Sequence, residues 1–555
     1  MKNSFELKYS CGGAAAGISG KISQNEHSFS DGTIAVTVFD EGSEHRVSVS
    51  ALKDVTLLSY KESGHNFYVG GSGSDNGAGD VFFLNGYQSW TDTKETYLSE
   101  KERNVKKLPR FLVDMFSFDR YGDALFYKYD SGKLHGYDVF YRKGSVNGFA
   151  INANAATAYL IFEVTRATGE VSIISDVSGL ALKNGETATV CDYFYTPSLE
   201  TGIKLMNEVF PVKERRKLFG YTSWYNYYQN IDEKIILRDL EALDSRFNLF
   251  QIDDGYETFV GDWLDVDPKK FPDGLAGIVD KIHAKGLMAG IWLAPLVAEQ
   301  NSVVYKEHPD WLKKGPDGLP VKCGCNWSGF YALDLENEDA RNYIANCLRH
   351  YAHMGFDIFK LDFLYASSLP VYDGLTRAQS AHRAYSFIRE ILGDRLILGC
   401  GASPFSSKDI FDYLRIGPDV SLDFDDKFYM RLMHRERVST KVTLQNTVYR
   451  SILNGRLFGN DPDVFLLRDT NISLTPEQRK ALITLNALFG SVLMTSDNIA
   501  EYDEPKNKTL AEALELYRFA KVHSYRRDGI YIKIRYDLKG EKRELTYNTK
   551  KGVLQ

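Results

Sequence analysis

The chain has 555 residues, of which 43% are hydrophobic and 25% are charged. This composition is that of an ordinary globular protein and excludes a disordered, collagen-like or coiled-coil chain. The net charge is -7, with 67 Lys and Arg against 74 Asp and Glu, and no basic stripe runs along the sequence, which argues against a nucleic-acid partner.

The cysteines and the apolar segments set the expected compartment. Six cysteines are too few for a disulfide scaffold in a chain of this length, and the spacing of Cys323 and Cys325 is too tight for a redox pair. A zinc site would need a second pair or nearby histidines at ligand spacing, and the sequence has neither. The first ten residues lack the apolar stretch of a signal peptide, and no segment is apolar for long enough to cross a membrane. We therefore predict a cytoplasmic protein with reduced thiols, no metal and no membrane partner.

Residues 1–205 are predicted to form an antiparallel β-sandwich. Segments rich in Val, Ile, Phe and Tyr follow one another at 33–40, 81–84, 124–129 and 160–164, separated by turn sequences such as 130–133. The only segment with a helical period is the exit segment at 199–209.

Residues 206–500 are predicted to form a (β/α)8 TIM barrel. Eight short apolar strands, at 218–223, 249–253, 287–294, 357–363, 396–400, 413–417, 457–460 and 491–494, alternate with amphipathic helices. The helix at 233–243 begins after Asp232, a plausible N-cap, and others lie at 275–282, 337–354 and 476–488. An open doubly wound sheet is the alternative, disfavoured because no strand leads into a glycine-rich phosphate turn.

Residues 501–555 are predicted to form a small C-terminal β-sheet domain. The chain is expected to return to strands after about Asp503, with the clearest strands at 529–535 and 545–547.

Polar residues gather where the predicted barrel strands end, which is where barrel enzymes carry their chemistry. In strand order they are Trp224 and Asn226, Asp253 and Asp254, Trp292, Lys360 and Asp362, Cys400, and Arg415 and Asp419. Five of the six tryptophans also lie between Trp224 and Trp327, and Trp90 is the exception. Carboxylates and amines for hydroxyl groups, with flat aromatic faces for the ring, predict a site for a sugar.

Asp362 and Asp419 are the candidates for glycosidic chemistry, which needs a nucleophile or base and a proton donor. Lys360 lies two residues before Asp362 and faces the same way, so its ammonium group is expected to lower the pKa of Asp362. A less polar setting at Asp419 could keep that carboxyl protonated. The alternative is that Lys360 and Asp362 form a buried ion pair and that Asp419 is a turn residue. The occurrence of both acids on alternate strands of one barrel favours catalysis.

Two pairs of acidic residues and one cysteine have competing interpretations. An Asp-Gly turn requires only one acidic residue, and this strand end has two, Asp253 and Asp254, so at least one is predicted to bind ligand. The pair Asp461 and Asp463 looks like a turn after the seventh strand and ranks below the others. Cys400 has no evident histidine partner and is interpreted as lining the pocket.

Five segments together resemble the α-galactosidases of glycoside hydrolase family 36. They are Asp253-Asp254-Gly255-Tyr256, Gly290-Ile-Trp292-Leu-Ala-Pro295, Lys360-Leu-Asp362-Phe, Cys400-Gly401 and Arg415-Ile-Gly-Pro-Asp419. The order of sandwich, barrel and short β-rich tail also resembles the layout of this family.

The resemblance implies a retaining hydrolysis of terminal α-linked galactose, with Asp362 as nucleophile and Asp419 as acid/base. It implies that Asp253, Asp254, Lys360, Cys400 and Arg415 contact sugar hydroxyls, and that Trp224 and Trp292 wall the pocket. It also implies a loop from the N-terminal domain in the pocket, for which 86–90, with Trp90, is the candidate. No cofactor is implied.

The chain departs from many family members at Leu361 and at Ala402 and Ser403. The departure at Ala402 and Ser403 leaves open an α-N-acetylgalactosaminidase on the same scaffold. The family that the chain resembles also contains α-galactosyl transferases, so the motifs leave that activity open as well. The main prediction is an α-galactosidase acting on small α-galactosides of the melibiose and raffinose type. A non-catalytic glycan-binding protein is the alternative from another class, and the presence of both Asp362 and Asp419 disfavours it.

Overall fold

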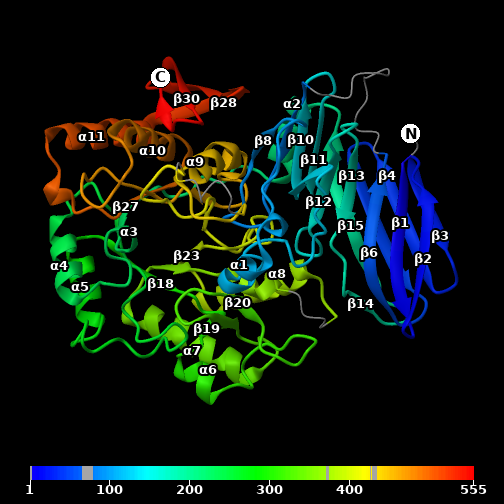
Figure 1. Ribbon diagram of the computed structural model, residues 1–555, viewed down its shortest axis with the longest axis horizontal. Coiled ribbons are helices and arrows are strands. Elements are labelled where there is room, and N and C mark those ends of the chain that lie inside the picture. Colours follow the sequence, from blue (N-terminus) through cyan, green and yellow to red (C-terminus); the bar gives the residue numbers. More distant parts are fainter. Residues whose placement is uncertain (1–2, 65–78, 370–373, 426, 428–433) are drawn as a thin grey trace.

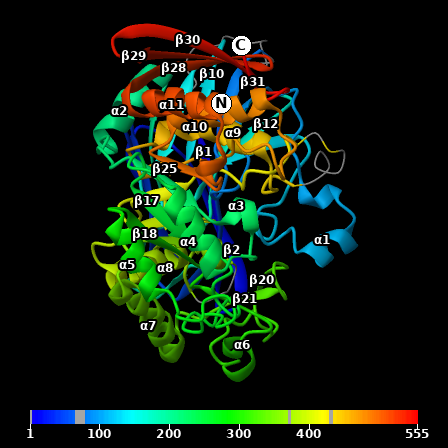
Figure 2. The same ribbon diagram turned by 90° about the vertical axis from the view of Figure 1, so that its left-hand side faces the viewer.

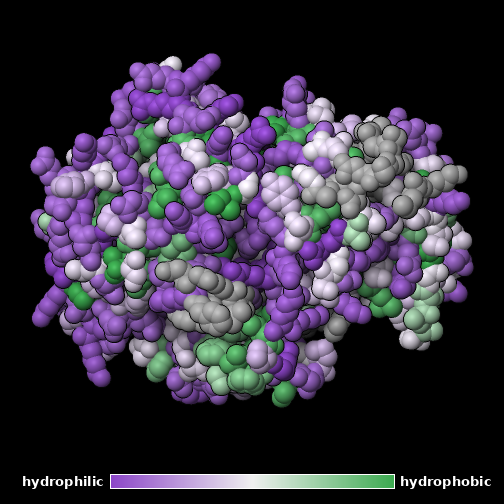
Figure 3. Space-filling view, turned by 45° about the horizontal axis from the view of Figure 1, so that its top comes forward, coloured by the Kyte–Doolittle hydropathy of each residue, from purple (hydrophilic) through white to green (hydrophobic). Residues whose placement is uncertain are grey.

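A computed structural model describes residues 3–64, 79–369, 374–425, 427 and 434–555. The N-terminal strands form one end of the molecule, and a parallel sheet surrounded by helices forms the other (Figure 1). The C-terminal strands lie beside α10 (Pro476–Phe489) and α11 (Glu504–Phe519) in both views (Figures 1 and 2). On the face seen in Figure 3, hydrophilic residues cover most of the surface.

Two antiparallel sheets build the N-terminal part. The first has the order β2 (Ala14–Lys21), β1 (Ser4–Cys11), β6 (Val55–Ser63), β13 (Val171–Ser175), β12 (Leu160–Thr165) and β9 (Lys133–Tyr137), with β14 (Ala181–Leu182) beside β6. The second has the order β3 (Asn25–Ser30), β4 (Ile34–Glu41), β5 (Glu44–Ala51), β15 (Thr187–Thr196), β11 (Gly148–Asn152), β10 (Val139–Lys143), β7 (Val81–Leu84) and β8 (Lys94–Thr96). Phe5 and Phe162 from the first sheet share one buried core with Val36 and Phe140 from the second. The predicted β-sandwich is confirmed.

The segment before β9 differs from the prediction. Residues 124–126 form a turn and 127–129 are irregular, so the expected strand is absent. Phe126 and Tyr127 both donate their N–H groups to the Asp123 carbonyl. Two short helices that the sequence pattern missed lie nearby, η1 (Val105–Lys107) and α1 (Arg110–Phe116). The helix expected at 199–209 is present as α2 (Leu199–Val209), capped by Ser198.

Parallel strands build the central sheet. Their order is β25 (Gly459–Asp461), β24 (Tyr413–Arg415), β23 (Leu396–Gly399), β22 (Ile358–Leu361), β18 (Met288–Leu293), β17 (Leu249–Ile252), β16 (Leu218–Thr222), β27 (Val492–Thr495) and β26 (Val464–Phe465). The two ends of this order, β25 and β26, belong to one stretch of chain that Pro462 and Asp463 interrupt. Proline has no N–H group for the ladder, so the stretch is split there. The sheet therefore closes on itself, and the predicted (β/α)8 barrel is confirmed.

Helices follow most of the barrel strands. They are α3 (Trp224–Tyr227), α4 (Glu233–Ala242), α5 (Ala276–Ala284), α7 (Glu338–Met354), α8 (Arg377–Leu392), α9 (Thr440–Tyr449), α10 and α11, with short 3-10 turns at η2 (Leu364–Ser368), η4 (Arg450–Leu453) and η5 (Ile499–Glu501). Asp232 caps α4 as predicted, since its carboxylate accepts the N–H of Ile235 at 2.8 Å. Between β23 and β24 the chain makes turns at 404–410 in place of a helix. A small sheet of β19 (Val297–Glu299), β21 (Phe330–Ala332) and β20 (Lys322–Gly324), with α6 (Val303–Glu307), fills the connection after β18.

The C-terminal segment begins with a helix, so the expectation of strands directly after Asp503 is wrong. Asp503 accepts the N–H of Lys506 at 3.0 Å, and Pro505 occupies the first turn of α11, where a missing N–H costs nothing. Tyr517 of α11 donates its hydroxyl to the Leu218 carbonyl at 3.0 Å, which ties this helix to the first barrel strand. The four-stranded sheet of β28 (Ala520–Asp528), β29 (Tyr531–Leu538), β30 (Glu541–Asn548) and β31 (Val553–Leu554) follows.

Candidate active site

Asp362 lies directly after β22, where protein groups hold both of its oxygens. Oδ2 accepts the indole N–H of Trp292 at 3.1 Å, and Oδ1 accepts the backbone N–H of Phe363 at 2.8 Å. Phe363 adopts a left-handed conformation, with φ of 54°, which turns the chain so that its N–H faces the carboxylate. The carboxylate is therefore fixed in position, and the residue is only partly buried.

The charge state of Asp362 differs from the prediction. Burial raises its pKa most, and the nearby Asp419 raises it further. Lys360 lowers the pKa of Asp362, as do the hydrogen bonds of Cys400 and Trp292, but the net shift is upward. The expectation that Lys360 keeps this pKa low is wrong in its outcome, because desolvation outweighs the ammonium group.

Lys360 is instead the partner of Asp253. Its ammonium group lies 2.8 Å from Asp253 Oδ2, and both side chains are buried. Asp253 raises the pKa of Lys360 above its ordinary value although burial, the largest single influence, acts the other way. Thr222 and Gln251 also donate to Asp253 Oδ2, at 3.0 and 2.8 Å, so this carboxylate is firmly oriented at the end of β17.

Asp254, the neighbouring acid, is held by Trp327 and Gln229. The Trp327 indole donates to Oδ2 at 3.0 Å, and the Gln229 amide donates to Oδ1 at 3.0 Å. Burial raises the pKa of Asp254, and the pKa of the buried Glu257 is also raised, by burial and then by Asp254. Neither Glu257 nor Trp327 was identified as a site residue from the sequence, and the tryptophan cluster was the only signal for Trp327.

Arg415 and Asp419 lie at the end of β24, and their surroundings are polar. Arg415 Nη1 lies 3.0 Å from Asp419 Oδ1, and about a third of the Asp419 side chain, 36%, is exposed. The less polar setting expected for Asp419 is therefore not found. Arg415 also pairs with Asp461 at 3.2 Å and with Asp463 at 2.7 Å, so the two acids ranked as a mere turn belong to this cluster.

Trp90 reaches the barrel from the N-terminal part. Its indole N–H donates to Cys400 Sγ at 3.4 Å, and its ring packs edge-on against Phe363 and Tyr365. Gly401 has φ of 65°, and a Cβ at this position would lie 3.1 Å from the Trp90 ring, so glycine permits the close approach. Burial raises the pKa of Cys400 well above its usual value, and Asp362 adds to this, so Cys400 is a neutral thiol.

The other tryptophans and Asn226 have different surroundings. Trp292 contacts Trp263 and Trp327, with ring centroids 5.7 and 6.2 Å apart, so these three form one cluster around Asp362 and Asp254. Trp224 packs edge-on against Tyr228, whose pKa is raised by burial and, to a smaller extent, by Asp419. Asn226 lies half-buried on α3 and interacts with the Tyr227 hydroxyl. Trp311 stacks on His308, outside the three-tryptophan cluster.

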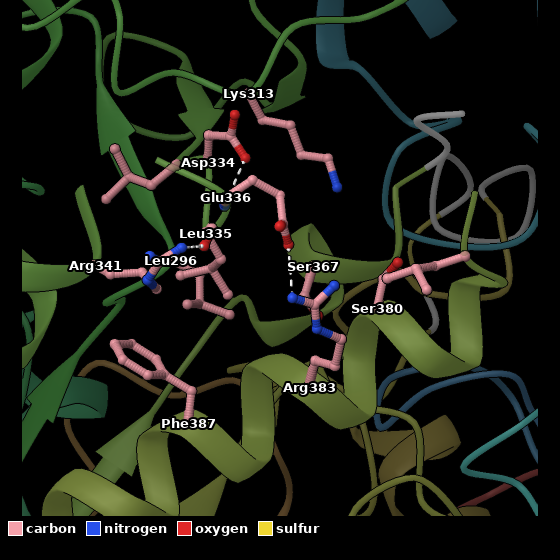
Figure 4. A pocket seen from close by; sticks show the side chains of 12 residues that line it. Leu296, Lys313, Asp334, Leu335, Glu336, Arg341, Ser367, Ser380, Arg383 and Phe387 are labelled. Carbon is pink, nitrogen blue, oxygen red and sulfur yellow. Dashed lines mark hydrogen bonds and ion pairs between the residues drawn. The ribbon is translucent and has the colours of Figure 1, made fainter. Parts of the chain in front are cut away.

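A cavity of about 430 Å³ is lined by neither Asp362 nor Asp419. Ser380, Arg383 and Phe387 of α8 line it, and Glu336 and Arg383 form an ion pair of 3.0 Å there (Figure 4). In the described part of the chain, no group of His, Cys, Asp and Glu side chains is arranged to hold a metal ion. Within the same residues, no helix is long and apolar enough to cross a membrane.

In the comparison with protein families, the matched residues lie mostly in the barrel. Residues 204–391 match the family model Melibiase. The chain is 30% identical over 185 residues to α-galactosidase AgaA of Geobacillus stearothermophilus, which is 32% of this chain and 23% of AgaA. It is also 32% identical over 157 residues to the A type blood α-D-galactosamine galactosaminidase of Flavonifractor plautii. That match covers 26% of this chain and 14% of the relative. These matches thus span less than a quarter of either curated relative.

One similar solved structure extends over nearly the whole chain. It is the α-galactosidase TtGalA of Thermus thermophilus in complex with p-nitrophenyl α-D-galactopyranoside, with a TM-score of 0.69 and 25% identity, covering 93% of this chain and 98% of TtGalA. A second structure of TtGalA holds stachyose and covers 88% of this chain and 99% of TtGalA, with a TM-score of 0.67.

The fold defines the chain as a multidomain (β/α)8-barrel protein with acidic groups at its strand ends. With the match of residues 204–391 to the Melibiase family model and these relatives, the chain is similar to the α-galactosidases of glycoside hydrolase family 36, such as AgaA.

Proposed function

We propose that the protein is a retaining α-galactosidase that removes terminal α-linked galactose from small α-galactosides of the melibiose and raffinose type. Asp362 is the nucleophile and Asp419 the acid/base. The carboxylate of Asp362 attacks the anomeric carbon while the bond to the leaving oxygen breaks and Asp419 gives that oxygen a proton. Asp419 then takes a proton from the water molecule that releases galactose from Asp362.

The observation that carries this proposal is the pair of acids at the ends of β22 and β24. Asp362 has both oxygens oriented by donors, and it is close enough to Asp419 for the charge of Asp419 to influence its pKa. Asp419 is partly exposed, so it can reach a leaving group and a water molecule. A retaining mechanism requires the two carboxyl groups to be about 5–5.5 Å apart.

The polar groups around Asp362 support a sugar ligand. Asp253, Asp254, Lys360, Cys400 and Arg415 would bind hydroxyls, and Trp292, Trp224 and Trp90 would form the walls. Asn226, whose side chain interacts with Tyr227, stays a weaker candidate. We add Trp327 as a wall residue, because its indole orients Asp254 and its ring contacts Trp292.

Hydrolysis of p-nitrophenyl α-galactoside by the wild type, Asp362→Ala and Asp419→Ala tests the assignment. We expect both variants to lose roughly 10³-fold or more in kcat/KM. Azide should restore turnover to both variants, giving the β-galactosyl azide with Asp362→Ala and the α-galactosyl azide with Asp419→Ala. Full activity in Asp362→Ala would overturn the proposed nucleophile.

An α-galactosaminide or α-N-acetylgalactosaminide substrate is the second candidate. It is favoured by the similarity to a relative named as an α-D-galactosamine galactosaminidase and by the segment from Cys400 to Ser403. Ratios of kcat/KM for the aryl α-galactoside, α-galactosaminide and α-N-acetylgalactosaminide decide between them. A lower kcat/KM for the aryl α-galactoside than for either amino-sugar substrate would contradict the proposed specificity.

We also propose that the protein acts in the cytoplasm. Its six cysteines are all free, which suits a reducing compartment. Fractionation of the producing cells, with an antibody to this chain, tests the location, and recovery from the medium would contradict it.

A further inference from the structure

The guanidinium group of Arg415 is shared by three carboxylates. Nη1 lies 3.0 Å from Asp419 Oδ1, Nε lies 3.2 Å from Asp461 Oδ2, and Nη2 lies 2.7 Å from Asp463 Oδ1. Arg415 and Asp461 are register partners on β24 and β25, and Asp463 lies two residues after Asp461, directly beyond the end of β25. Only Asp419 among the three acids is substantially exposed, at 36% of its side chain, whereas the others are at 3% or less.

Asp463 contacts both Arg415 and the backbone beside Asp419. Its Oδ2 accepts the N–H of Val420 at 2.8 Å, and the same oxygen accepts the Tyr225 hydroxyl. The N–H of Asp463 donates to Asp461 Oδ1 at 2.9 Å, which holds its left-handed backbone, with φ of 73°. One carboxylate therefore fixes the cation that faces Asp419 and the residue that follows Asp419.

We propose that Asp463 is a positioning residue that controls how strongly Arg415 acts on Asp419, and thereby how tightly Asp419 holds its proton. This inference rests on the proposed function, in which Asp419 is the acid/base. When Asp463 is ionised it competes for the guanidinium charge, so Asp419 keeps its proton to higher pH. When Asp463 is neutral, Arg415 stabilises the ionised form of Asp419 more fully, and Asp419 loses its proton at lower pH.

Asp463 is able to change its charge near neutral pH. Burial raises its pKa to about 7, with Asp419 and Asp461 acting in the same direction and Arg415 and Tyr225 opposing them. The titratable and charged groups around these two acids lie on or directly after β22, β23, β24, β25 and α3. They are Arg415, Asp419, Asp461, Asp463, Asp362, Cys400, Tyr225 and Tyr228.

The test compares two aryl α-galactosides in the wild type and Asp463→Asn. Phenyl α-galactoside has a poor leaving group and needs the proton of Asp419, whereas 2,4-dinitrophenyl α-galactoside does not. Asparagine keeps the shape of Asp463 and tolerates its left-handed backbone. We expect the basic limb of kcat/KM for the phenyl substrate to move to lower pH by about one pH unit. With the dinitrophenyl substrate, the basic limb of kcat/KM should lie at the same pH in Asp463→Asn as in the wild type.

A second variant and a control keep the test decisive. Tyr225→Phe removes the hydroxyl that lowers the pKa of Asp463, so Asp463 stays protonated to higher pH and the limb should move in the same direction by a smaller amount. Asp412→Asn is the matched control, because Asp412 pairs with Arg389 at the other end of the same strand, at 2.6 Å. We expect this control to leave the limb unchanged.

Two results separate the inference from the function on which it rests. An unchanged basic limb in Asp463→Asn, or in Tyr225→Phe if the first variant does not fold, would overturn the role of Asp463. If Asp419→Ala instead loses equal activity on both substrates, Asp419 is not the acid, and the proposed function fails at that residue.

Discussion

The carboxylate of Asp362 receives a hydrogen bond on each oxygen, and the Trp292 bond has a measurable consequence. Such a bond stabilises the ionised form, so Trp292 opposes the upward shift that burial gives the pKa of Asp362. A tryptophan that walls a pocket is thus also an electrostatic partner of the proposed nucleophile.

Trp292→Phe should therefore raise the pKa of Asp362. The nucleophile must be ionised, so the acidic limb of kcat/KM in the free enzyme should move to higher pH by about one pH unit. Trp327→Phe is the matched control, since its indole donates to Asp254, and it should leave this limb in place. If the acidic limb of kcat/KM lies at the same pH in the wild type and Trp292→Phe, the indole hydrogen bond has no effect on the pKa of Asp362.

The sequence predicted which residues cluster at the strand ends better than it predicted their partners. Lys360 shares a strand face with Asp362, but the closed barrel brings Asp253 from β17 within 2.8 Å of it. Strand periodicity predicts on which side of the strand a side chain lies, but it does not predict which residues of other strands lie opposite that side chain. The cluster of Asp461 and Asp463 was ranked low for the same reason, because a turn and a buried ion-pair cluster look alike in one sequence.

At the scale of elements, Arg450 joins the N-terminal loop to the barrel. This buried arginine at the start of η4 donates to the carbonyls of Gly86, Gln88, Ser89 and Ile416 and to the Asn85 side chain. Burial lowers its pKa to about 9, and Arg435 contributes to the shift. Carbonyl oxygens thus take the place of a carboxylate partner.

Arg450→Lys should displace the loop that carries Trp90. Lysine has no planar fork, so several buried carbonyls would lose their donors, at about 1–3 kcal/mol each. We expect a lower Tm and a raised KM for p-nitrophenyl α-galactoside. Arg456→Lys is the control, because Arg456 donates to Asn207 at 3.1 Å and makes no bond to this loop. An Arg450→Lys variant with wild-type Tm and KM would contradict this role.

Element types were predictable wherever periodicity was long or the run strongly apolar. All eight barrel strands are found where the sequence indicates them. The failures include η1, α1, α11 and the absence of a strand at 124–129. The aromatic residues at 124–129 favour a strand locally, but Tyr129 and Tyr137 both donate to Asp123, and this tertiary cluster fixes the turn.

On the scale of the whole molecule, a buried ion cluster links the segment before β9 to the loop before α9. His135 lies 3.1 Å from Glu102 and 2.7 Å from Asp123, and Arg435 lies 3.3 Å from Glu102. The pKa of His135 rises to about 9 although burial acts against this, because the two carboxylates stabilise its charge. The pKa values of Asp123 and Glu102 are lowered, because His135 and Arg435 outweigh burial.

These shifts predict the pH dependence of stability. A raised histidine pKa adds stability that is complete below its ordinary value of 6.5 and is lost as pH rises through about 9. Lowered carboxylate pKa values add stability that is complete above their ordinary values of about 4–4.5 and is lost at lower pH. The difference in Tm between the wild type and His135→Gln should thus be greatest between about pH 4.5 and 6.5. A difference that grows above pH 9 would contradict this assignment.

The order of sandwich, barrel and terminal sheet could be predicted from the change in rhythm along the chain. The contacts between these parts could not, since no local pattern reveals that Phe83 and Tyr141 of β7 and β10 join the same apolar cluster as the barrel strands. Domain boundaries therefore stay a prediction, and α11, which packs on the barrel, shows how a helix can precede the C-terminal sheet.

The position of Trp90 has a consequence for how the proposed activity can be altered. The residue lies on a loop of the sandwich, far along the chain from every proposed acid, yet its indole touches Cys400. Under the proposed function, the sugar preference is open to change from the sandwich, which holds neither of the two proposed catalytic acids. A barrel excised at residue 206 would retain both acids and lose one wall, and libraries built only on barrel loops would leave that wall unexplored.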